Sequence, residues 1–445
     1  MGQALTSRKP AVSDHRALRF LTAGSVDDGK STLIGRLLYD SRAILADQLD
    51  TLEKKAAGAA IDLSLLTDGL EAEREQGITI DVAYRYFATR ERKFIIADAP
   101  GHEQYTRNMV TAAAGSDAAV VLVDITKLDL GAKPVALLPQ TRRHALLAHL
   151  LRVPSIVFAV NKIDAVDDPK AAFETVAEAL RAFASAAGIE TAGVIPVSAL
   201  RGDNVTAKQA AGWFDGPTLL ELLESLPTAQ ERTDGALLVP VQYVQRDEAG
   251  QGAQAEGAGV QPRTLWGRIA HGRVRAGDQV QVFPSGEQAT VAGVRRAGET
   301  VDAAEAGQSA GIVLDRQLDV SRGDWIASAP QDAGEAAFDA RQEFDATLAW
   351  LDTEPAQVGR RYWVRHGNRW VQARITSIEH RLDIHTLEEI EAHQLAVNEI
   401  GHVRLQAQQP LPVEPYVTNR VAGALIVVDP ASHRTSGALL VRAAT

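Results

Sequence analysis

Apolar residues in the first half of the chain form short runs that alternate with stretches of helical spacing. Leu18–Ala23 is such a run, and it leads through a glycine-containing loop into a helical stretch at 30–39. The same alternation continues to about Pro227. We therefore predict βαβ units, which means a mainly parallel sheet with helices on both faces. The expected further strands are 94–97, 118–123, 155–160 and 194–197, and the expected further helices are 140–151 and 171–187.

The second half has a different pattern, with short strands, frequent turn residues and little helical periodicity. Residues 279–282 alternate apolar and polar side chains with period two, and a Pro-Ser-Gly turn follows at 284–286. Another strand is expected at 325–327, after a Gly-Asp turn. These features predict two antiparallel β-barrels. We divide the chain into a disordered lead-in (1–17), an α/β domain (18–228) and two barrel domains (229–332 and 333–445), with a mobile hairpin loop at 245–262 and a linker at 331–335.

Length and composition limit the classes of protein to which the chain can belong. A chain of 445 residues predicts about three domains, and 57 acidic against 46 basic residues give a net charge of −11, which disfavours a nucleic-acid partner. Cysteine is absent, which excludes disulfides and thiolate catalysis and fits a reducing cytoplasm. The apolar runs are too short to cross a membrane, and the polar N-terminus lacks the core of a signal peptide. We expect a cytoplasmic protein without a membrane association.

The segment after the first strand carries a phosphate-binding motif. Gly24 to Ser31 fits the pattern G-x-x-x-x-G-K-S/T, and it lies between a strand and a helix, as the chemistry requires. Backbone N–H groups of such a loop hold phosphate oxygens, Lys30 is expected to reach the β and γ phosphates, and the Ser31 hydroxyl to bind Mg²⁺. The motif occurs once, and the alternative is a chance match on a glycine turn. The expected nucleotide contacts here are Gly24, Ser25, Val26, Asp27, Asp28, Gly29, Lys30, Ser31 and Thr32.

Two later motifs favour guanine over adenine. In the run Asn161-Lys162-Ile163-Asp164, the Asp164 carboxylate can accept bonds from two N–H groups of guanine that adenine does not offer. Asn161 is expected at the opposite base edge, and the Lys162 stem over the ring. Ser198-Ala199-Leu200 follows a later strand, and the Ala199 N–H is expected to meet the base carbonyl. Either motif alone also occurs on ordinary surface loops.

The expected switch elements surround the γ-phosphate. Asp98, which follows a buried strand, is predicted to hold Mg²⁺ through water, and Gly101 to contact the γ-phosphate and act as a hinge. Thr79 is expected to complete the Mg²⁺ shell. His102 is the candidate for positioning the attacking water, against the alternative of a structural loop histidine. The expected contacts in this loop are Asp98, Ala99, Pro100, Gly101 and His102, and no arginine finger is assigned.

The combined motifs resemble one GTPase family. The order of a GTP-binding domain and two barrels resembles translation factors, and the double aspartate Asp27-Asp28 resembles the large GTP-binding subunit of bacterial sulfate adenylyltransferase (ATP sulfurylase). The resemblance covers about residues 15–442. Further stretches that carry it are Glu73 to Tyr86, Gly101 to Met109, Gln140 to His144, Gly202 to Val205, Ser321 to Asp324, Asn398 to Gly401 and Asn419-Arg420.

The resemblance implies GTP and Mg²⁺ as ligands and a hetero-oligomer as the working form. A small catalytic subunit would form adenosine 5′-phosphosulfate and pyrophosphate from ATP and sulfate, and this chain would drive that step by GTP hydrolysis, in sulfate assimilation. The alternative is an elongation-factor-like GTPase that delivers aminoacyl-tRNA. The connection at 127–139 is longer than is usual in the family, and we expect it not to touch the nucleotide-binding motifs. With no second phosphate loop, the adenylylsulfate kinase domain of some relatives is expected to be missing.

Overall fold

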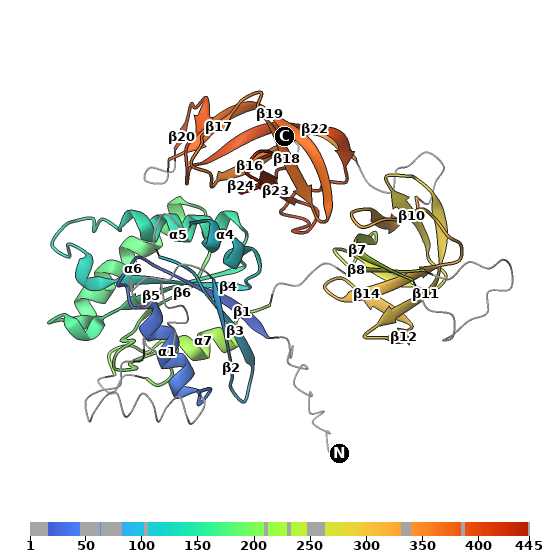
Figure 1. The fold of residues 1–445 in the computed structure, drawn as a ribbon. Helices are drawn as coiled ribbons and strands as arrows, with labels where there is room; N and C mark the ends of the chain where they lie inside the picture. The colour runs from blue at the N-terminus through green and yellow to red at the C-terminus, as the bar shows by residue number, and fades with distance from the viewer. Residues whose placement is uncertain are drawn as a thin grey trace, which may run out of the picture. The chain divides into compact units, whose positions relative to one another are not determined.

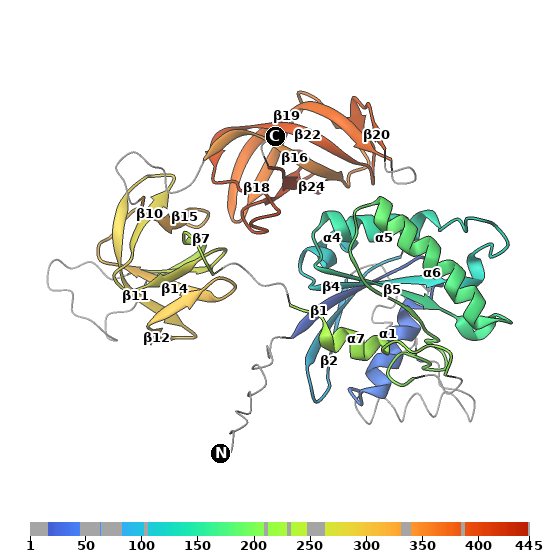
Figure 2. The ribbon, with the colours of Figure 1, turned by 180° about the vertical axis from the view of Figure 1, so that it is seen from behind.

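The protein is described from a computed structural model of residues 1–445. The described residues are 17–44, 63, 82–101, 106–208, 212–228, 233–246, 263–330, 340–383 and 388–443. They belong to two compact units, Met1–Ala229 and Gln230–Thr445. Figures 1 and 2 show the elements of each unit from opposite sides.

The first unit is a twisted sheet with helices on both faces. Its strand order is β2-β3-β1-β4-β5-β6, and every neighbouring pair is parallel except β2 with β3. Helices α4, α5 and α6 lie along one face, and α1 and α7 along the other (Figure 1). The strands are β1 Leu18–Ala23, β2 Ala83–Ala88, β3 Lys93–Asp98, β4 Ala118–Asp124, β5 Ser155–Asn161 and β6 Thr191–Pro196. The helices are α1 Lys30–Asp40, α4 Thr106–Ala114, α5 Pro139–Leu150, α6 Pro169–Ala186 and α7 Leu219–Ser225, with short 3₁₀ turns η3 Ile125–Lys127 and η4 Ile163–Ala165.

Burial explains why these segments form strands at the centre of the sheet. All residues of β4 and β5 are buried, as expected for parallel strands covered by helices on both sides. The strand predicted at 194–197 lies somewhat earlier in the structure, where β6 spans Thr191–Pro196. Strand β2 was not predicted. It is an edge strand whose Tyr84 and Tyr86 are exposed, so its sequence lacks the apolar run on which the other predictions depend.

The second unit contains two closed antiparallel barrels. In the first, the order β10-β15-β7-β8-β14-β11 is closed by the pairing of β10 with β11, and β12 extends the sheet beside β11. A small β9–β13 sheet accompanies it. Valine and isoleucine side chains dominate its core. The strands are β7 Leu238–Arg246, β8 Arg263–Arg268, β9 Arg273–Arg275, β10 Gln279–Phe283, β11 Gln288–Arg296, β12 Glu299–Val301, β13 Ala303–Glu305, β14 Ser309–Leu314 and β15 Trp325–Ser328.

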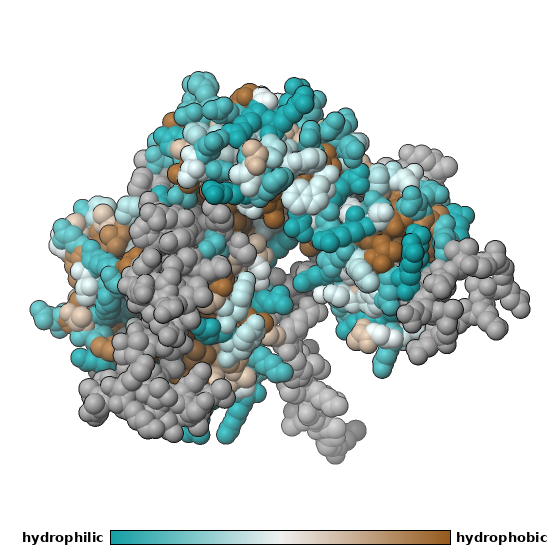
Figure 3. Space-filling view, viewed as in Figure 1, coloured by the Kyte–Doolittle hydropathy of each residue, from teal (hydrophilic) through white to brown (hydrophobic). Residues whose placement is uncertain are grey.

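The second barrel has the order β18-β23-β24-β16-β22-β19, closed by β18 with β19, and β20 pairs with the end of β19. Its visible surface is largely hydrophilic (Figure 3), while apolar side chains fill the interior around Trp350 and Tyr362. The strands are β16 Arg341–Trp350, β17 Ala356–Gln357, β18 Arg361–His366, β19 Arg369–Leu382, β20 Glu389–Ile390, β21 Gln394–Leu395, β22 Ile400–Leu411, β23 Ala424–Val428 and β24 Thr435–Val441.

The predicted fold class, an α/β domain followed by two antiparallel barrels, is thus confirmed. Strands β7 and β8 pair up to Arg246 and Arg263, so the segment between them joins a hairpin, although residues 247–262 themselves lie outside the described residues. The predicted linker at 331–335 also lies outside them, as does the lead-in apart from Ala17. No helix in the described ranges is both long and apolar enough to cross a bilayer.

Candidate functional site

The predicted nucleotide motifs follow the carboxyl ends of parallel strands. Because these ends meet at one edge of the sheet, loops far apart in sequence come together there. The loop from Gly24 to Gly29 follows β1. Asp98 is the last residue of β3, and the predicted switch segment begins there. Asp124, Asn161 and Ser198 stand at or just after the ends of β4, β5 and β6.

The phosphate loop closes around the side chain of Lys30. The Lys30 Nζ donates to the backbone carbonyls of Gly24 (2.9 Å) and Ser25 (2.8 Å), and only 7% of the residue is exposed. Gly29 has a φ of +93°, and a Cβ there would stand 2.4 Å from the Asn161 Nδ2. Glycine is therefore needed at this position both for the backbone conformation and for the close approach of Asn161.

The buried Lys30 ammonium has lost its hydration, and nearby negative charge balances its positive charge only in part. Desolvation lowers the pKa of Lys30, while the nearby carboxylates of Asp98 and Asp28 act in the opposite direction. A buried cation bonded to two neutral carbonyls gains from an additional anion. The residues present therefore fit a phosphate group in this loop.

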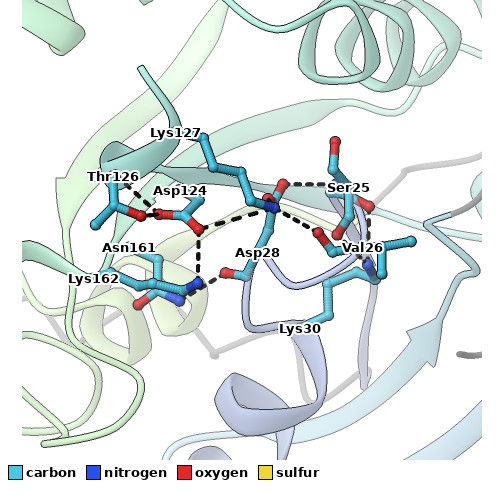
Figure 4. A network of polar contacts seen from close by, with 10 residues as sticks. Ser25, Val26, Asp28, Lys30, Asp124, Thr126, Lys127, Asn161 and Lys162 are labelled. Atoms are coloured by element: carbon cyan, nitrogen blue, oxygen red, sulfur yellow. Dashed lines mark hydrogen bonds and ion pairs between the residues drawn. The ribbon is translucent and has the colours of Figure 1, made fainter. Parts of the chain in front are cut away.

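A second lysine, Lys127, also contacts the phosphate loop. Its Nζ lies 2.8 Å from the Asp28 Oδ1 and donates to the Val26 carbonyl at 2.6 Å (Figure 4). Asp28 is fully buried and also accepts from the Ser25 N–H at 2.6 Å. This role of Lys127 was not predicted from the sequence. The expectation that the connection at 127–139 does not touch the nucleotide-binding motifs is wrong at its first residue.

The local backbone explains how Lys127 reaches the loop. The Asp124 side chain accepts from the Thr126 N–H at 3.0 Å and caps the 3₁₀ turn η3, which follows β4 directly. Lys127 is the last residue of that turn. The sequence signal that was available is the spacing: a lysine three residues after an aspartate that ends a fully buried strand.

Asp124 extends the ionic network toward the base motif. Its Oδ2 lies 2.7 Å from the Lys162 Nζ and 3.9 Å from the Lys127 Nζ (Figure 4). Burial alone would raise the pKa of Asp124, but the hydrogen bonds from Lys162 and Thr126 outweigh it and hold the pKa below its usual value. A continuous chain of charges thus joins the phosphate loop to the loop after β5.

Asn161 connects the same two loops through its side-chain amide. The Nδ2 donates to the Asp28 carbonyl at 2.8 Å, and the Oδ1 accepts from the Ala199 N–H at 3.0 Å. The sequence predicted that the Asn161 side chain and the Ala199 N–H face the base. In the structure the two groups bond to each other, and Asn161 also bonds to the Asp28 carbonyl, so its side chain holds the three loops together.

The remaining base-motif residues form the rim of this edge. The Asp164 carboxylate is 13% exposed and lies 3.5 Å from the Arg201 Nε. Ser198 is buried, and its Oγ accepts from the Arg201 N–H at 3.0 Å, which fixes the turn. Leu200 is exposed. Lys162 adopts a φ of +63° at the start of the 3₁₀ turn η4, in which Ile163 is buried and Asp164 is partly exposed.

The segment after β3 packs directly on the phosphate loop. Asp98 is buried, and one carboxylate oxygen accepts from the Thr22 Oγ1 at 3.3 Å. A Cβ on Gly101 would stand 2.4 Å from the Lys30 Nζ and 2.5 Å from the Gly24 carbonyl. The Asp98 carboxylate and the Ser31 hydroxyl are oxygen donors of the kind that Mg²⁺ prefers. Thr79 and His102, the two other predicted residues, lie outside the described residues.

Comparisons with known proteins agree with this arrangement. Residues 15–230 match the family described as the elongation factor Tu GTP binding domain, and residues 343–442 match the GTP-eEF1A C-terminal domain-like family. The chain is 43% identical to the sulfate adenylyltransferase subunit 1 of Laribacter hongkongensis, over 96% of this chain and 85% of that protein.

Other relatives carry the same description or a longer architecture. The sulfate adenylyltransferase subunit 1 of Aeromonas hydrophila is 42% identical over 95% of this chain and 85% of the relative. The bifunctional enzyme CysN/CysC of Xylella fastidiosa is 46% identical over 95% of this chain, which spans 65% of that protein. With identity of this level along nearly its whole length, the chain belongs to the family of sulfate adenylyltransferase subunit 1.

Proposed function

We propose that this protein is the GTP-hydrolysing subunit of a cytoplasmic sulfate adenylyltransferase. GTP binds at the carboxyl edge of the first sheet, and its hydrolysis drives the formation of adenosine 5′-phosphosulfate and pyrophosphate by a separate catalytic subunit. The observation that carries the proposal is the convergence of Lys30, Asp28 and Asn161 in one bonded cluster, in a chain of this family. We retain the division into a GTP-binding domain (18–228) and two barrel domains (229–332 and 333–445).

In this proposal the phosphate loop supplies the affinity for the triphosphate. The Lys30 Nζ exchanges its bonds to the Gly24 and Ser25 carbonyls for phosphate oxygens, and the loop N–H groups and the start of α1 add further donors. The gain is large because the ammonium is already desolvated in the protein, so binding does not require its removal from water.

Mg²⁺ is the proposed cofactor, held by Ser31, Asp98 and Thr79. When bound, the ion neutralises charge that builds up on the phosphate oxygens. Asp98 is positioned for this by its hydrogen bond from Thr22 and by the packing of the following segment on the phosphate loop.

Selection of guanine is assigned to the rim after β5 and β6. Asp164 accepts from two N–H groups of the base, while Lys162, held by Asp124, covers one face of the ring. An adenine base would leave the Asp164 carboxylate without those donors, which costs more than the loss of an ordinary surface contact.

For the hydrolytic step we propose that His102 positions the attacking water and that the Gly101 N–H contacts the γ-phosphate. Gly101 supports this assignment through its contact with Lys30, since any side chain there would displace the lysine. Loss of the γ-phosphate removes the contact with Gly101, which couples the nucleotide state to the segment that follows.

Coupling to a partner requires that the nucleotide state and the catalytic subunit change each other's affinity. A reconstitution with the small catalytic subunit tests this directly, with sulfate-dependent ATP–pyrophosphate exchange as the readout. GTP should stimulate the exchange with the wild-type chain and not with Lys30→Ala. The control is Lys170→Ala, an exposed lysine on α6, which should behave as wild type. Equal stimulation by GTP with Lys30→Ala would contradict the proposal, as would GTP-dependent binding of aminoacyl-tRNA without any effect on the exchange.

A further inference from the structure

A pair of histidines on the second barrel has no part in the nucleotide site. His380 on β19 and His402 on β22 stand directly opposite each other in the antiparallel register of the two strands. Their rings are 4.3 Å apart between centroids and inclined by 67°. Their side chains are 17% and 22% exposed, so the pair lies at the edge of the barrel, within reach of solvent.

Two ring nitrogens of this pair lack hydrogen-bond partners. The His380 Nε2 and the His402 Nδ1 are inaccessible to solvent and make no hydrogen bond within the described part of the chain. The His380 Nε2 lies 3.0 Å from the Glu389 Oε1 without hydrogen-bond alignment, and the His402 Nδ1 lies 3.9 Å from the same oxygen. Both nitrogens thus have a carboxylate nearby but no aligned hydrogen bond, and this arrangement calls for an explanation.

Two carboxylates stand beside the histidines. One ligand atom each from Glu379, His380 and His402 fall within 4.8 Å of one another, and Glu389 approaches from β20. Ligand atoms around a tetrahedral zinc ion, at bonds of about 2.0–2.1 Å, are separated by about 3.3 Å. The ligand atoms of Glu379, His380 and His402 are at most about 1.5 Å farther apart than this, so side-chain rotations would have to bring them closer around an ion.

We propose that His380, His402 and one of the two carboxylates bind a divalent transition-metal ion, with zinc as the preferred ion. Two imidazoles with a carboxylate suit zinc and its neighbours, whereas Mg²⁺ and Ca²⁺ prefer oxygen ligands alone. The site is thus chemically distinct from the proposed Mg²⁺ site, and it does not depend on the proposed function.

The atoms within 4.8 Å of one another include a Glu379 oxygen and not one from Glu389, but the surrounding charges favour Glu389 as the third ligand. Glu379 also lies 3.9 Å from the Arg404 Nη2 and 3.7 Å from the Arg442 Nη1, and these cations compete for its charge. Glu389 belongs to β20, which joins the barrel through a two-residue pairing with β19. A bound ion would connect β19, β20 and β22, so it would fasten this short edge strand to the barrel.

The test uses the full chain, stripped of metal with a chelator and saturated with Mg²⁺, and titrates it with zinc chloride by calorimetry. We expect one tight zinc site per chain, and a loss of affinity of at least tenfold in His380→Ala and in His402→Ala. The control variant is His433→Asn, which changes an exposed histidine with a φ of +57° elsewhere in the same barrel. This variant should leave the site intact.

Two further readouts keep the result interpretable if an alanine variant is unstable. Cobalt substituted for zinc should give the visible bands of a tetrahedral site with nitrogen ligands, and zinc should raise the unfolding temperature of wild type more than that of Glu389→Gln. If Glu379→Gln weakens zinc binding and Glu389→Gln does not, the other carboxylate is the ligand and the site stands. Zinc affinity of wild type no greater than that of the His380→Ala/His402→Ala double variant would overturn the proposal and leave an edge-to-face histidine pair with a structural role only.

Discussion

The ion pair between Lys127 and Asp28 gives a prediction that the motifs alone do not make. Lys127→Met keeps the length of the side chain but removes the charge that lies 2.8 Å from a fully buried carboxylate. Asp28 then keeps the bond from the Ser25 N–H and loses its cationic partner. We expect the phosphate loop to relax and the affinity for guanine nucleotide to fall, although Lys127 does not belong to the phosphate-binding motif.

The magnitude follows from the burial of the two partners. Removing one partner of a fully buried pair costs about 3–5 kcal/mol, and an exposed pair is worth about 0–1 kcal/mol. The Lys127 side chain is 33% exposed and that of Asp28 is not exposed at all, so this pair lies between the two cases. We expect about 1–3 kcal/mol, which is a loss of about 5- to 150-fold in affinity.

A double-mutant cycle isolates the pair from other effects of the substitutions. Affinities for a fluorescent guanine nucleotide are measured for wild type, Lys127→Met, Asp28→Asn and the double variant. Because Asp28→Asn removes the buried charge, Lys127→Met should cost at least about 1 kcal/mol less in that background. Lys133→Met, at an exposed lysine of the same connection, is the matched control and should be neutral. Additive effects within about 0.3 kcal/mol would show that the pair does not support the phosphate loop.

Three other changes probe separate parts of the structure. Gly29→Ala should weaken nucleotide binding at least tenfold in a titration, because its Cβ meets Asn161, whereas Gly188→Ala, with a φ of +66° and open space around it, should change stability but not affinity. Asp164→Asn should lower GTP affinity and raise that for xanthosine triphosphate in a competition assay; unchanged preference would exclude the carboxylate from base recognition. Burial lowers the pKa of His366 to about 4, so its contribution to stability is complete above pH 6.5 and is lost as the pH falls toward 4. Unfolding curves should therefore show a fall of up to about 3 kcal/mol over that range that is smaller in His366→Phe, and an identical pH profile for both would refute the assignment.

The fold and most positions of the site follow from local sequence patterns. The fully buried strands β4 and β5 appear as unbroken apolar runs, and parallel strands put the residues after them on one edge, so Asp98 and Asn161 could be expected near Lys30. Edge strand β2 was not predicted, because Tyr84 and Tyr86 are exposed and burial does not require an apolar run at such positions.

Side-chain partnerships across the fold could not be predicted in the same way. The contact of Lys127 with Asp28 joins residues 99 positions apart, and it depends on a 3₁₀ turn that a single capping aspartate creates. The pairing of His380 with His402 depends on the register of β19 and β22. This register shifts at two places in β19 before it reaches His380. Patterns of hydrophobicity fix which face of a strand is buried, but they do not fix the register to one residue when bulges intervene.

The most direct measurement is the equilibrium binding of nucleotides to the purified full chain in the presence of magnesium. We predict saturable binding of one GTP per chain, displaced by GDP and not by ATP at comparable concentration. Binding of ATP as tight as that of GTP would contradict the guanine site after β5 and β6. No binding of GTP at all would contradict the central claim, that Lys30 and the loop around it hold a guanine nucleotide.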